Sequence, residues 1–467
     1  MRLIPTYKVA KGVRFSNNSW KNFTEQPWAA GGILLLCVVI AMLLANLPAT
    51  RDIYHNFLNT NLTATIQSPL RPDGTRVIDW TFPKDMNIEK FINDFLMVIF
   101  FFSVGLEIKR EISCGELSSP KKALLPVIAA AGGMAMPALI FAAFNNGSMA
   151  ASGWGIPTAT DIAFAVGIMS ILGNKVPVSL KIFLTALAIA DDLGAILVVA
   201  LFYGGNISIP LLCIAMLILA GTYLLNLMGE KRMMFYLVPA IAIWFLFYYS
   251  GIHSTMSGVV MAFMIPMEPR FSYAYISRRG RQYKNRLKAY ASDEPFPNDM
   301  QRHCLRRMSY INKNAVGLSY RLEQALNPYV NFLIMPIFAL ANAGVMIPDI
   351  SYFNIFQYSP EIGSVGMGVF FGLLLGKPVG ITLASLLAIK GKVGEMPANA
   401  NWKMLFAVAC LGGIGFTMSI FVDTLSFKDF PQYTEHLRSC GKIAVLMGSL
   451  SAGILGSVLI SLFAKKR

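Results

Sequence analysis

The chain has 467 residues, of which 55% are hydrophobic and only 14% are charged, and its mean hydropathy is +0.55. A soluble protein would carry about 25% charged residues, so these values exclude an ordinary soluble globular protein. The formal net charge of +15 would suit a nucleic-acid-binding protein. Most Lys and Arg, however, lie in alternate connections between apolar segments. That distribution follows the positive-inside rule of membrane proteins, and we expect no nucleic-acid partner.

Apolar runs recur along the whole chain, and each is close to the about 20 residues that a helix needs to cross a bilayer. We count twelve runs and expect each to be a transmembrane helix. Their approximate limits are 29–48, 91–107, 123–144, 156–174, 179–203, 208–228, 234–250, 252–267, 329–347, 364–389, 403–423 and 440–463. The sequence therefore predicts an all-α polytopic membrane protein.

The basic residues also predict which side of the membrane each connection faces. The N-terminal tail, residues 1–28, and the C-terminal Lys465, Lys466 and Arg467 are both basic. We therefore expect both termini to be cytoplasmic, in agreement with an even number of spans. The first apolar run is longer than a typical signal sequence, so we expect it to be retained. Residues 29–467 then form a single transmembrane domain.

Two connections within this domain are long. Residues 49–90 face the outside in this topology, and the stretch 75–82 has the pattern of a small β-hairpin. Residues 268–328 face the cytoplasm and are rich in Lys and Arg. A solvated basic loop beside anionic lipid headgroups is the simplest interpretation of this segment, and a dedicated regulatory element is the alternative.

Two predicted spans are interrupted by residues that break helices. The fourth contains Pro157 within GIPTATD, and the eleventh contains GGIG at 412–415. Pro frees a backbone carbonyl and Gly makes unwinding easier, but unwound backbone at membrane depth must be satisfied by protein or a wet cavity. The fourth span is the middle one of spans three to five, and the eleventh is the middle one of spans ten to twelve. Corresponding helices of these two triplets run in opposite directions. The pattern predicts inverted-topology repeats with two broken helices that cross near the midplane.

Asp191 and Asp192 are neighbours within the apolar run Ile182 to Tyr203. A charged side chain at the centre of the bilayer costs roughly 2.5–3.5 kcal/mol on insertion scales, so such a pair usually has a function. Low dielectric and a neighbouring carboxylate both favour the protonated form. Na⁺ or Li⁺ needs carboxylate, carbonyl or hydroxyl oxygens, and Thr158 and Thr160 offer hydroxyl groups nearby. We therefore expect a proton and a small cation to compete for this pair.

Asp161 in the fourth span and Lys377 in the tenth are further charged residues at membrane depth. A buried Lys pairs with an acid or offsets the negative ends of helices, and an Asp offsets the positive ends in the same way. The two residues would then balance charge where the broken helices meet. The alternative is a purely structural pair that holds the crossing together.

Asp94, Glu107 and His253 lie near the predicted ends of spans, where charged groups cost little. Ordinary solvated helix ends explain the two acids at least as well as a function does. A lone His is more often a packing residue than a pH switch. The six cysteines lack CxxC spacing, so we expect neither disulfides nor a zinc site, and no cofactor.

Several long motifs resemble those of the NhaA-type sodium/proton antiporter family, in the same order. They are PTATDIAFAVGI, LAIADDLGAI, SGIHSTMSG, ANAGV, GKPVGI and GGIGFTMSIF. The resemblance runs from about residue 28 to the C-terminus and omits most of 270–315. It implies a Na⁺(Li⁺)/H⁺ antiporter of the bacterial inner membrane that exchanges external protons for cytoplasmic sodium by alternating access. Such a protein serves pH and sodium homeostasis and is not an enzyme.

The resemblance also implies roles for individual residues. Asp191 and Asp192 match the carboxylates that bind the cation and the protons, and Thr160 matches a hydroxyl of the ion site. Asp161 and Lys377 match residues that balance charge at the crossing, with Lys377 able to pair with Asp191. The positions linked to transport or to pH response are matched by Asp94, Glu107, His253 and Glu323.

The family exchanges more protons than cations per cycle, so the resemblance implies electrogenic transport. It also implies a homodimer formed through an external β-hairpin, which 75–82 would supply. This chain departs from the best-known members in two places. Its loop at 268–315 is longer and very basic, and Gln324 and Asn327 stand near Glu323 where relatives can carry histidine. Both changes are on the predicted cytoplasmic side, so the pH profile is the least transferable property.

Three alternatives to an antiporter remain open from the sequence. A Na⁺- or H⁺-coupled symporter of a small solute would need specificity residues, and no Arg or aromatic cluster accompanies the Asp pair. An intramembrane aspartyl protease also uses two Asp residues, but its GxGD pattern is missing before Asp191. An ion channel would need a filter sequence, which we do not find.

Overall fold

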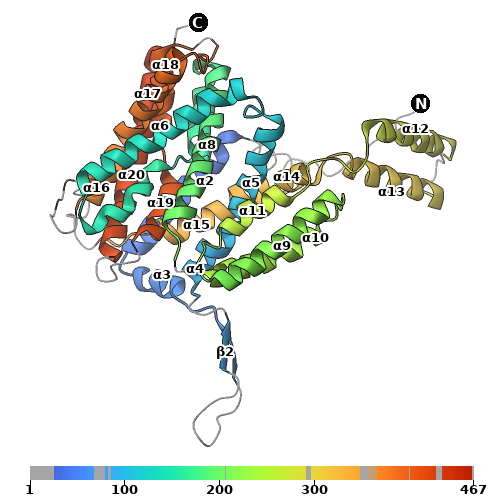
Figure 1. Cartoon of the computed structure of the whole chain (residues 1–467), viewed down its shortest axis with the longest axis horizontal. Coiled ribbons are helices and arrows are strands. Elements are labelled where there is room, and N and C mark those ends of the chain that lie inside the picture. The colour runs from blue at the N-terminus through green and yellow to red at the C-terminus, as the bar shows by residue number, and fades with distance from the viewer. Residues whose placement is uncertain are drawn as a thin grey trace, which may run out of the picture. The chain divides into compact units, whose positions relative to one another are not determined.

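The structure is a computed structural model and describes residues 26–67, 79–82, 86–205, 207–290, 296–347, 356, 358, 363–398, 400–427 and 434–464. Its helices and strands are labelled in Figure 1. The chain divides into two units. The first unit comprises Met1–Met97, Cys114–Gly204 and Asn331–Arg467, and the second comprises Val98–Ser113 and Gly205–Val330. Residues 1–25 of the basic N-terminal tail and the last three residues lie outside the described part of the chain.

The first unit contains most of the helices. They are α2 (Pro27–Asn46), α3 (Arg51–Leu58), α4 (Ile88–Phe91), η1 (Ile92–Leu96), α6 (Pro120–Asn145), η2 (Met149–Thr158), α7 (Ile162–Leu172), η3 (Gly173–Lys175), α8 (Val178–Phe202), α15 (Met335–Asn342), α16 (Val365–Phe371), η6 (Gly372–Gly376), α17 (Lys377–Lys390), α18 (Trp402–Leu411), α19 (Phe416–Ser426) and α20 (Thr434–Phe463). The helix η4 (Val330–Ile334) begins where the second unit ends.

The helices of the second unit include the basic segment. They are α5 (Met97–Cys114), α9 (Ile209–Leu227), α10 (Met234–Ser250), α11 (Met256–Met264), α12 (Tyr273–Ala289), α13 (Asp299–Lys313) and α14 (Leu318–Tyr329). The helix α5 begins one residue before this unit and ends one residue after its first segment.

The length and hydropathy of the helices confirm an all-α polytopic membrane protein. Eight described helices are long and apolar enough to cross a membrane, or ten if each of two bent helix pairs is one span. The predicted spans 234–250 and 252–267 correspond to the shorter helices α10 and α11. The second of these has only nine helical residues because residues 251–255 form a turn at Gly251, whose φ of 84° suits glycine. The count of twelve spans therefore stays a prediction.

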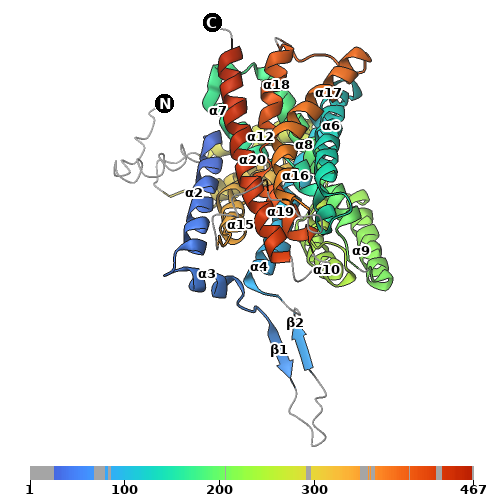
Figure 2. The ribbon, with the colours of Figure 1, turned by 90° about the vertical axis from the view of Figure 1, so that its left-hand side faces the viewer.

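Helices α6 and α17 pack closely along each other in the first unit (Figure 2). Small residues let the two backbones approach, because a Cβ at Gly380 of α17 would overlap the carbonyl oxygen of Gly132 of α6. The neighbouring Gly133 lies against the side chain of Lys377. This close contact therefore fixes the position of the first residue of α17.

Two pairs of helices in the first unit are bent at short breaks, one beside Pro157 and one at the Gly-rich stretch 412–415. That they are broken transmembrane helices of inverted repeats, which cross near the midplane, stays a prediction. The axes of η2 and α7 are bent by 40°, and those of α18 and α19 by 52°. The two interruptions contact each other: the amide nitrogen of Asp161 donates to the carbonyl of Ile414 at 2.6 Å. The hydroxyl of Thr160 lies 2.8 Å from the carbonyl of Gly412. Unwound backbone is thus satisfied by its counterpart, as an apolar surrounding requires.

Two short antiparallel strands, β1 (Ala64–Gln67) and β2 (Asp79–Phe82), form a hairpin between α3 and α4 (Figure 2). The second strand lies within the predicted stretch 75–82, and its partner precedes that stretch. Residues 68–78 of this hairpin lie outside the described residues. The external position of the hairpin and its role in a homodimer stay predictions.

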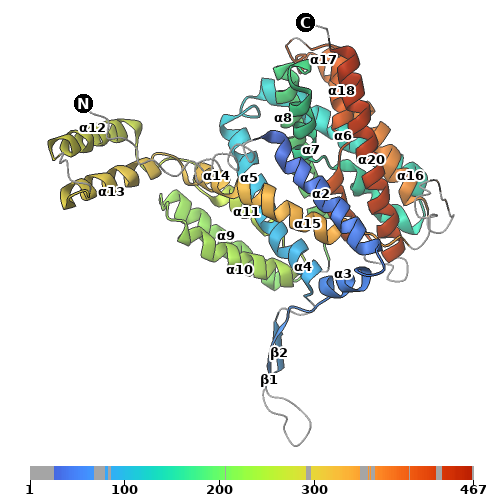
Figure 3. The same ribbon diagram turned by 180° about the vertical axis from the view of Figure 1, so that it is seen from behind.

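The basic connection of the second unit contains two helices, α12 and α13, packed side by side (Figure 3). Helix α13 begins with a capping box in which Asn298 and Gln301 satisfy each other's backbone amides. The side chain of Gln301 also donates to the carbonyl of Tyr290 at the end of α12. The predicted loop therefore contains an ordered helical hairpin.

The contact between α6 and α17 can be tested by adding one methyl group. Gly380→Ala forces the two helices apart and should destabilise the protein by about 1–3 kcal/mol, the usual cost of overpacking. Gly221→Ala on α9 is the matched control, because a Cβ there meets nothing within 4 Å. Thermal unfolding in detergent, followed by thiol-dye fluorescence, should show a lower midpoint for Gly380→Ala only. Equal midpoints for both variants would contradict this packing.

Candidate ion-binding site

Helix α8 carries Asp191 and Asp192 into the interior of the first unit. Its 25 residues are mostly apolar, yet both side chains are buried, with exposed fractions of 0% and 3%. Adjacent residues on a helix point about 100° apart, so the two carboxylates face different neighbours. The pair that the sequence singles out therefore lies at a buried position.

Asp191 is the centre of a compact polar cluster drawn from three elements. Its Oδ2 lies 2.5 Å from Nζ of Lys377 and 2.7 Å from the hydroxyl of Thr160. The same ammonium group donates to Thr160 Oγ1 at 2.8 Å. Both Asp191 and Lys377 are completely buried, so they form an ion pair away from solvent. The structure thus contains the contact between Lys377 and Asp191 that the family resemblance implies.

One oxygen of this cluster is left over. Asp191 Oδ1 is buried and has no hydrogen-bond partner in the described part of the protein. An unsatisfied buried carboxylate oxygen is costly, and a bound proton or cation removes that cost. The cluster also contains two neutral oxygen ligands: the hydroxyl of Thr160, 2.7 Å from Asp191 Oδ2, and the carbonyl of Gly412, 2.8 Å from that hydroxyl. Unwound carbonyls beside carboxylates are the ligands that transporters offer to Na⁺.

Asp161 links the beginnings of two half-helices. It is the N-cap of α7, where its Oδ1 accepts from the amide of Phe164 at 3.3 Å. Its Oδ2 accepts from the amide and hydroxyl of Thr417, the second residue of α19, at 3.2 and 2.5 Å. A negative charge between two helix N-termini is favourable, because both carry a partial positive charge. This geometry fits the predicted charge-balancing role of Asp161.

Two threonines differ from what the sequence indicates. Thr158 does not reach the site, because its hydroxyl donates to the carbonyl of Gly155 in its own helix. Thr417 was not identified, although it holds Asp161. No local signal marks it in the sequence, because it stands two residues after the Gly-rich interruption at 412–415, between the apolar Phe416 and Met418.

Glu107 and Glu323 are brought together in the second unit by an arginine. Arg110 Nε lies 3.0 Å from Glu323 Oε1, and Arg110 Nη2 lies 3.9 Å from Glu107 Oε1. Arg110 also pairs with Glu111 at 2.9 Å. The guanidinium group of Arg110 therefore interacts with three carboxylates. Glu107 and Glu323 are among the residues expected from the sequence, but Arg110 and Glu111 are not. Asn327 accepts from the hydroxyl of Ser103 at 3.1 Å on the same group of helices.

The last two predicted residues lie in different units. Asp94 lies in η1 of the first unit, and its side chain is half-buried. His253 lies in the turn before α11 of the second unit, and it too is half-buried. Their predicted roles in transport or pH response stay predictions.

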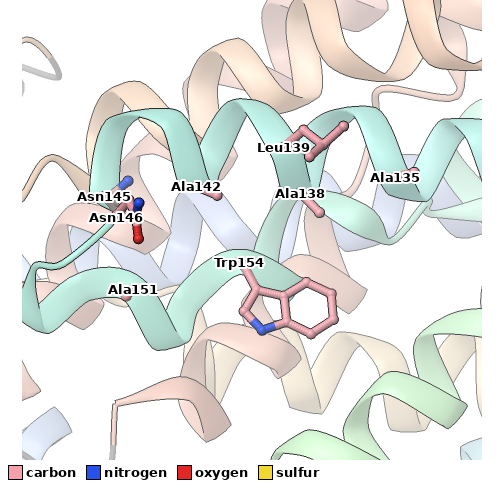
Figure 4. A pocket seen from close by; sticks show the side chains of 8 residues that line it. All are labelled: Ala135, Ala138, Leu139, Ala142, Asn145, Asn146, Ala151 and Trp154. Carbon is pink, nitrogen blue, oxygen red and sulfur yellow. The ribbon is translucent and has the colours of Figure 1, made fainter.

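A groove of about 540 Å³ lies between α6 and η2, away from the ionisable cluster (Figure 4). Its lining consists of Ala135, Ala138, Leu139, Ala142, Asn145, Asn146, Ala151 and Trp154. None of these side chains carries a charge, and most are small and apolar. The groove is therefore unsuited to binding an ion.

The fold and the buried cluster together define a multi-pass membrane protein with ionisable side chains in its interior. The profile of the family described as "Na+/H+ antiporter 1" matches residues 21–460. Similar proteins named "Na(+)/H(+) antiporter NhaA" come from Oleidesulfovibrio alaskensis, at 41% identity over 94% of this chain and 93% of the relative, and from Pelagibacter ubique, at 39% over 96% and 98%. A third, from Bacteroides thetaiotaomicron, is 40% identical over 94% and 96%. The chain belongs to the Na⁺/H⁺ antiporter 1 family.

Family membership confirms the resemblance that the motifs indicate. The matched proteins are named as antiporters, and the match covers almost their whole length. The symporter, protease and channel alternatives therefore lose their support. The family is one of transporters, which fits the expectation that the chain is not an enzyme.

The role of the Thr160 hydroxyl can be tested against that of Thr158. Thr160→Val removes a hydroxyl that contacts both Asp191 and Lys377, and should weaken Na⁺ binding by about 1–2 kcal/mol, roughly a tenfold increase in Kd. Thr158→Val removes a hydroxyl bonded only to Gly155 and should leave Kd within about twofold. Calorimetric titration of the purified protein at one fixed pH measures both constants. An unchanged Kd in Thr160→Val would remove Thr160 from the site.

Proposed function

We propose that this protein exchanges Na⁺ or Li⁺ for H⁺ across the bacterial inner membrane, and that Asp191 and Asp192 bind either the cation or protons. The observation that carries this proposal is the buried Asp191–Lys377 pair at the place where two interrupted helices meet. Membership of an antiporter family supports the same reaction class.

Competition at Asp191 Oδ2 supplies the coupling in this mechanism. In the structure the ammonium of Lys377 satisfies that oxygen and compensates the charge of Asp191. A Na⁺ ion that binds either oxygen of the Asp191 carboxylate lies next to this ammonium group, and the repulsion between the two cations opposes their simultaneous binding. Binding of the metal ion therefore displaces positive charge, carried by Lys377 or by protons, from the site.

Alternating access follows from the interrupted helices. The half-helices α7 and α19 are joined to η2 and α18 by unwound segments, and such segments are hinges because few backbone bonds resist their rotation. Asp161 and Thr417 couple α7 to α19, so the two halves would move together. We infer that this movement opens the ion site first to one side of the membrane and then to the other.

Several finer features belong to the same proposal. Both termini are cytoplasmic, the exchange is electrogenic, and the protein works as a homodimer in contact with membrane lipid. Asp94, Glu107, His253 and Glu323 take part in transport or in its pH response. The cluster around Arg110 supports a role for Glu107 and Glu323, because a change in the charge of one acid alters the balance of the whole group.

The direct test replaces each carboxylate by its neutral isostere. Asp191→Asn and Asp192→Asn should each reduce Na⁺-driven proton movement to the background of vesicles that lack the protein, because the amide binds neither ion. Thr185→Val on the same helix is the control, since its hydroxyl donates only to the carbonyl of Lys181. A pH-sensitive dye in everted membrane vesicles reports the exchange. Normal exchange by both Asn variants would end this proposal.

A further inference from the structure

A second groove, of about 500 Å³, lies in the first unit, and none of its lining side chains belongs to the cluster around Asp191. Its walls are formed by helices α2, α7 and α20. Helix α7 packs against both of the others (Figure 2). On α20 the lining extends from Leu446 to Val458, which is about 18 Å of helix. A groove with this length and volume is narrow.

The floor of this groove is formed by buried side chains at the break between α18 and α19. Ile414 and Phe416 both line the groove, and their exposed fractions are only 3% and 5%. The ring of Phe416 meets the ring of Phe164 of α7 edge-on, with 5.3 Å between the centroids. The groove therefore reaches inward to the place where α7 and α19 meet.

The lining of the groove suits an apolar occupant. None of the described residues that line it is charged, and apart from Trp28 the only polar side chains are Ser449 and Ser457. The hydroxyl of Ser449 accepts from the amide of Gly415 at 3.2 Å, and that of Ser457 donates to the carbonyl of Gly453 at 2.7 Å. An ordered water needs about two to four polar partners, so this lining favours an apolar molecule over water or a polar solute.

The rim of the groove shows what lies next to it. Leu35 of α2, Ile171 of α7 and Leu450 of α20 line the groove, and each is more than half exposed. Both α2 and α20 are long and apolar enough to cross a membrane. The rim is thus continuous with helix faces that contact the hydrocarbon of the bilayer, and lipid acyl chains are the apolar molecules at the opening.

The size of the groove favours an acyl chain over a helix of a second copy of this chain. A helix with its side chains is about 10 Å across, so a groove of this volume admits little more than one turn of it. An acyl chain is thinner, and one leaflet is half of a hydrocarbon core about 30 Å thick, so its chains are similar in length to the groove. An empty groove would leave its lining without contacts, which a chain restores.

We propose that this groove binds one acyl chain of a membrane lipid. The chain lies along α20 between α2 and α7, and its inner part packs on Ile414 and Phe416. Lipid tails are as apolar as the groove, so packing contacts rather than the hydrophobic effect hold the chain in place. The inference concerns a separate site of the first unit and does not depend on the proposed antiport.

The test uses the full-length protein in liposomes that contain a phospholipid with a photoreactive diazirine in one acyl chain. After illumination and digestion, mass spectrometry locates the labelled residues. A chain in the groove should label the buried floor at Ile414 or Phe416, which a lipid at the outer surface does not reach. Leu375 of η6 is exposed and should be labelled by ordinary surrounding lipid, so it serves as the internal standard.

Two variants fill the groove from different helices. Gly32→Phe adds a ring beside Trp28 on α2, and Gly453→Leu adds a side chain beside Ile414 on α20. Both should lose the label at the floor and keep the label at Leu375, which also shows that each variant has inserted. Gly221→Phe on α9 is the matched control, because a Cβ there meets nothing within 4 Å, and it should keep both labels.

Four results would overturn the proposal. The floor stays unlabelled in the unchanged protein, or it stays labelled in both filled variants. Labelling of the floor by a photoreactive fatty acid but not by the phospholipid would show that the occupant is a free amphiphile. A label that appears at the floor only after dilution to monomers would show that a second copy of the chain covers the groove.

Discussion

The ion pair between Asp191 and Lys377 is the interaction on which the rest of the site depends. Both groups are completely buried, and an isolated charge at such a position costs several kcal/mol. The pair is tolerable because the two groups lie 2.5 Å apart and share Thr160. Any ion that reaches Asp191 has to compete with this internal cation. The same contact therefore holds the cluster together and, in the proposed mechanism, makes cation binding an exchange of charges.

The surrounding helices position Lys377 and the oxygen groups beside Asp191. Helices α6 and α17 approach through Gly132 and Gly380, and this approach places Lys377 in the interior. The two interruptions satisfy each other's backbone groups and bring a carbonyl oxygen and Thr160 to Asp191. Asp161 compensates the helix ends that these interruptions create. Broken helices are costly in an apolar environment, and here the amide of Asp161 and the carbonyls of Ile414 and Gly412 all have partners across the two breaks.

The sequence predicts the all-α membrane fold because apolar runs are a local signal, and the helix breaks and the buried charges lie at positions that the sequence also marks. Asp191, Asp192 and Lys377 stand out as charges within apolar runs, and Pro157 marks a break. Thr417 has no such signal: its partner Asp161 is 256 residues away, and only the fold joins them. Arg110 lacks a signal for a similar reason, because it is one of several charged residues at the predicted end of the second span.

The burial of Asp423 could not be predicted from the sequence, for a different reason. Asp423 stands at the predicted end of the span 403–423, where an acid costs little and attracts no attention. The structure continues α19 to Ser426 and covers Asp423 with α20, so the acid is fully buried. Span limits from hydropathy are uncertain by a few residues, and that uncertainty decides whether a terminal acid is solvated or buried.

The most direct test of the account is the affinity for Na⁺ as a function of pH. If Na⁺ and protons compete for the carboxylates of Asp191 and Asp192, Kd for Na⁺ should rise as the pH falls from about 8.5 to 6.5, by about tenfold per pH unit for each proton displaced. Calorimetric titration of the purified protein measures this dependence without transport. A Kd that is the same throughout this range would contradict the competition on which the mechanism rests.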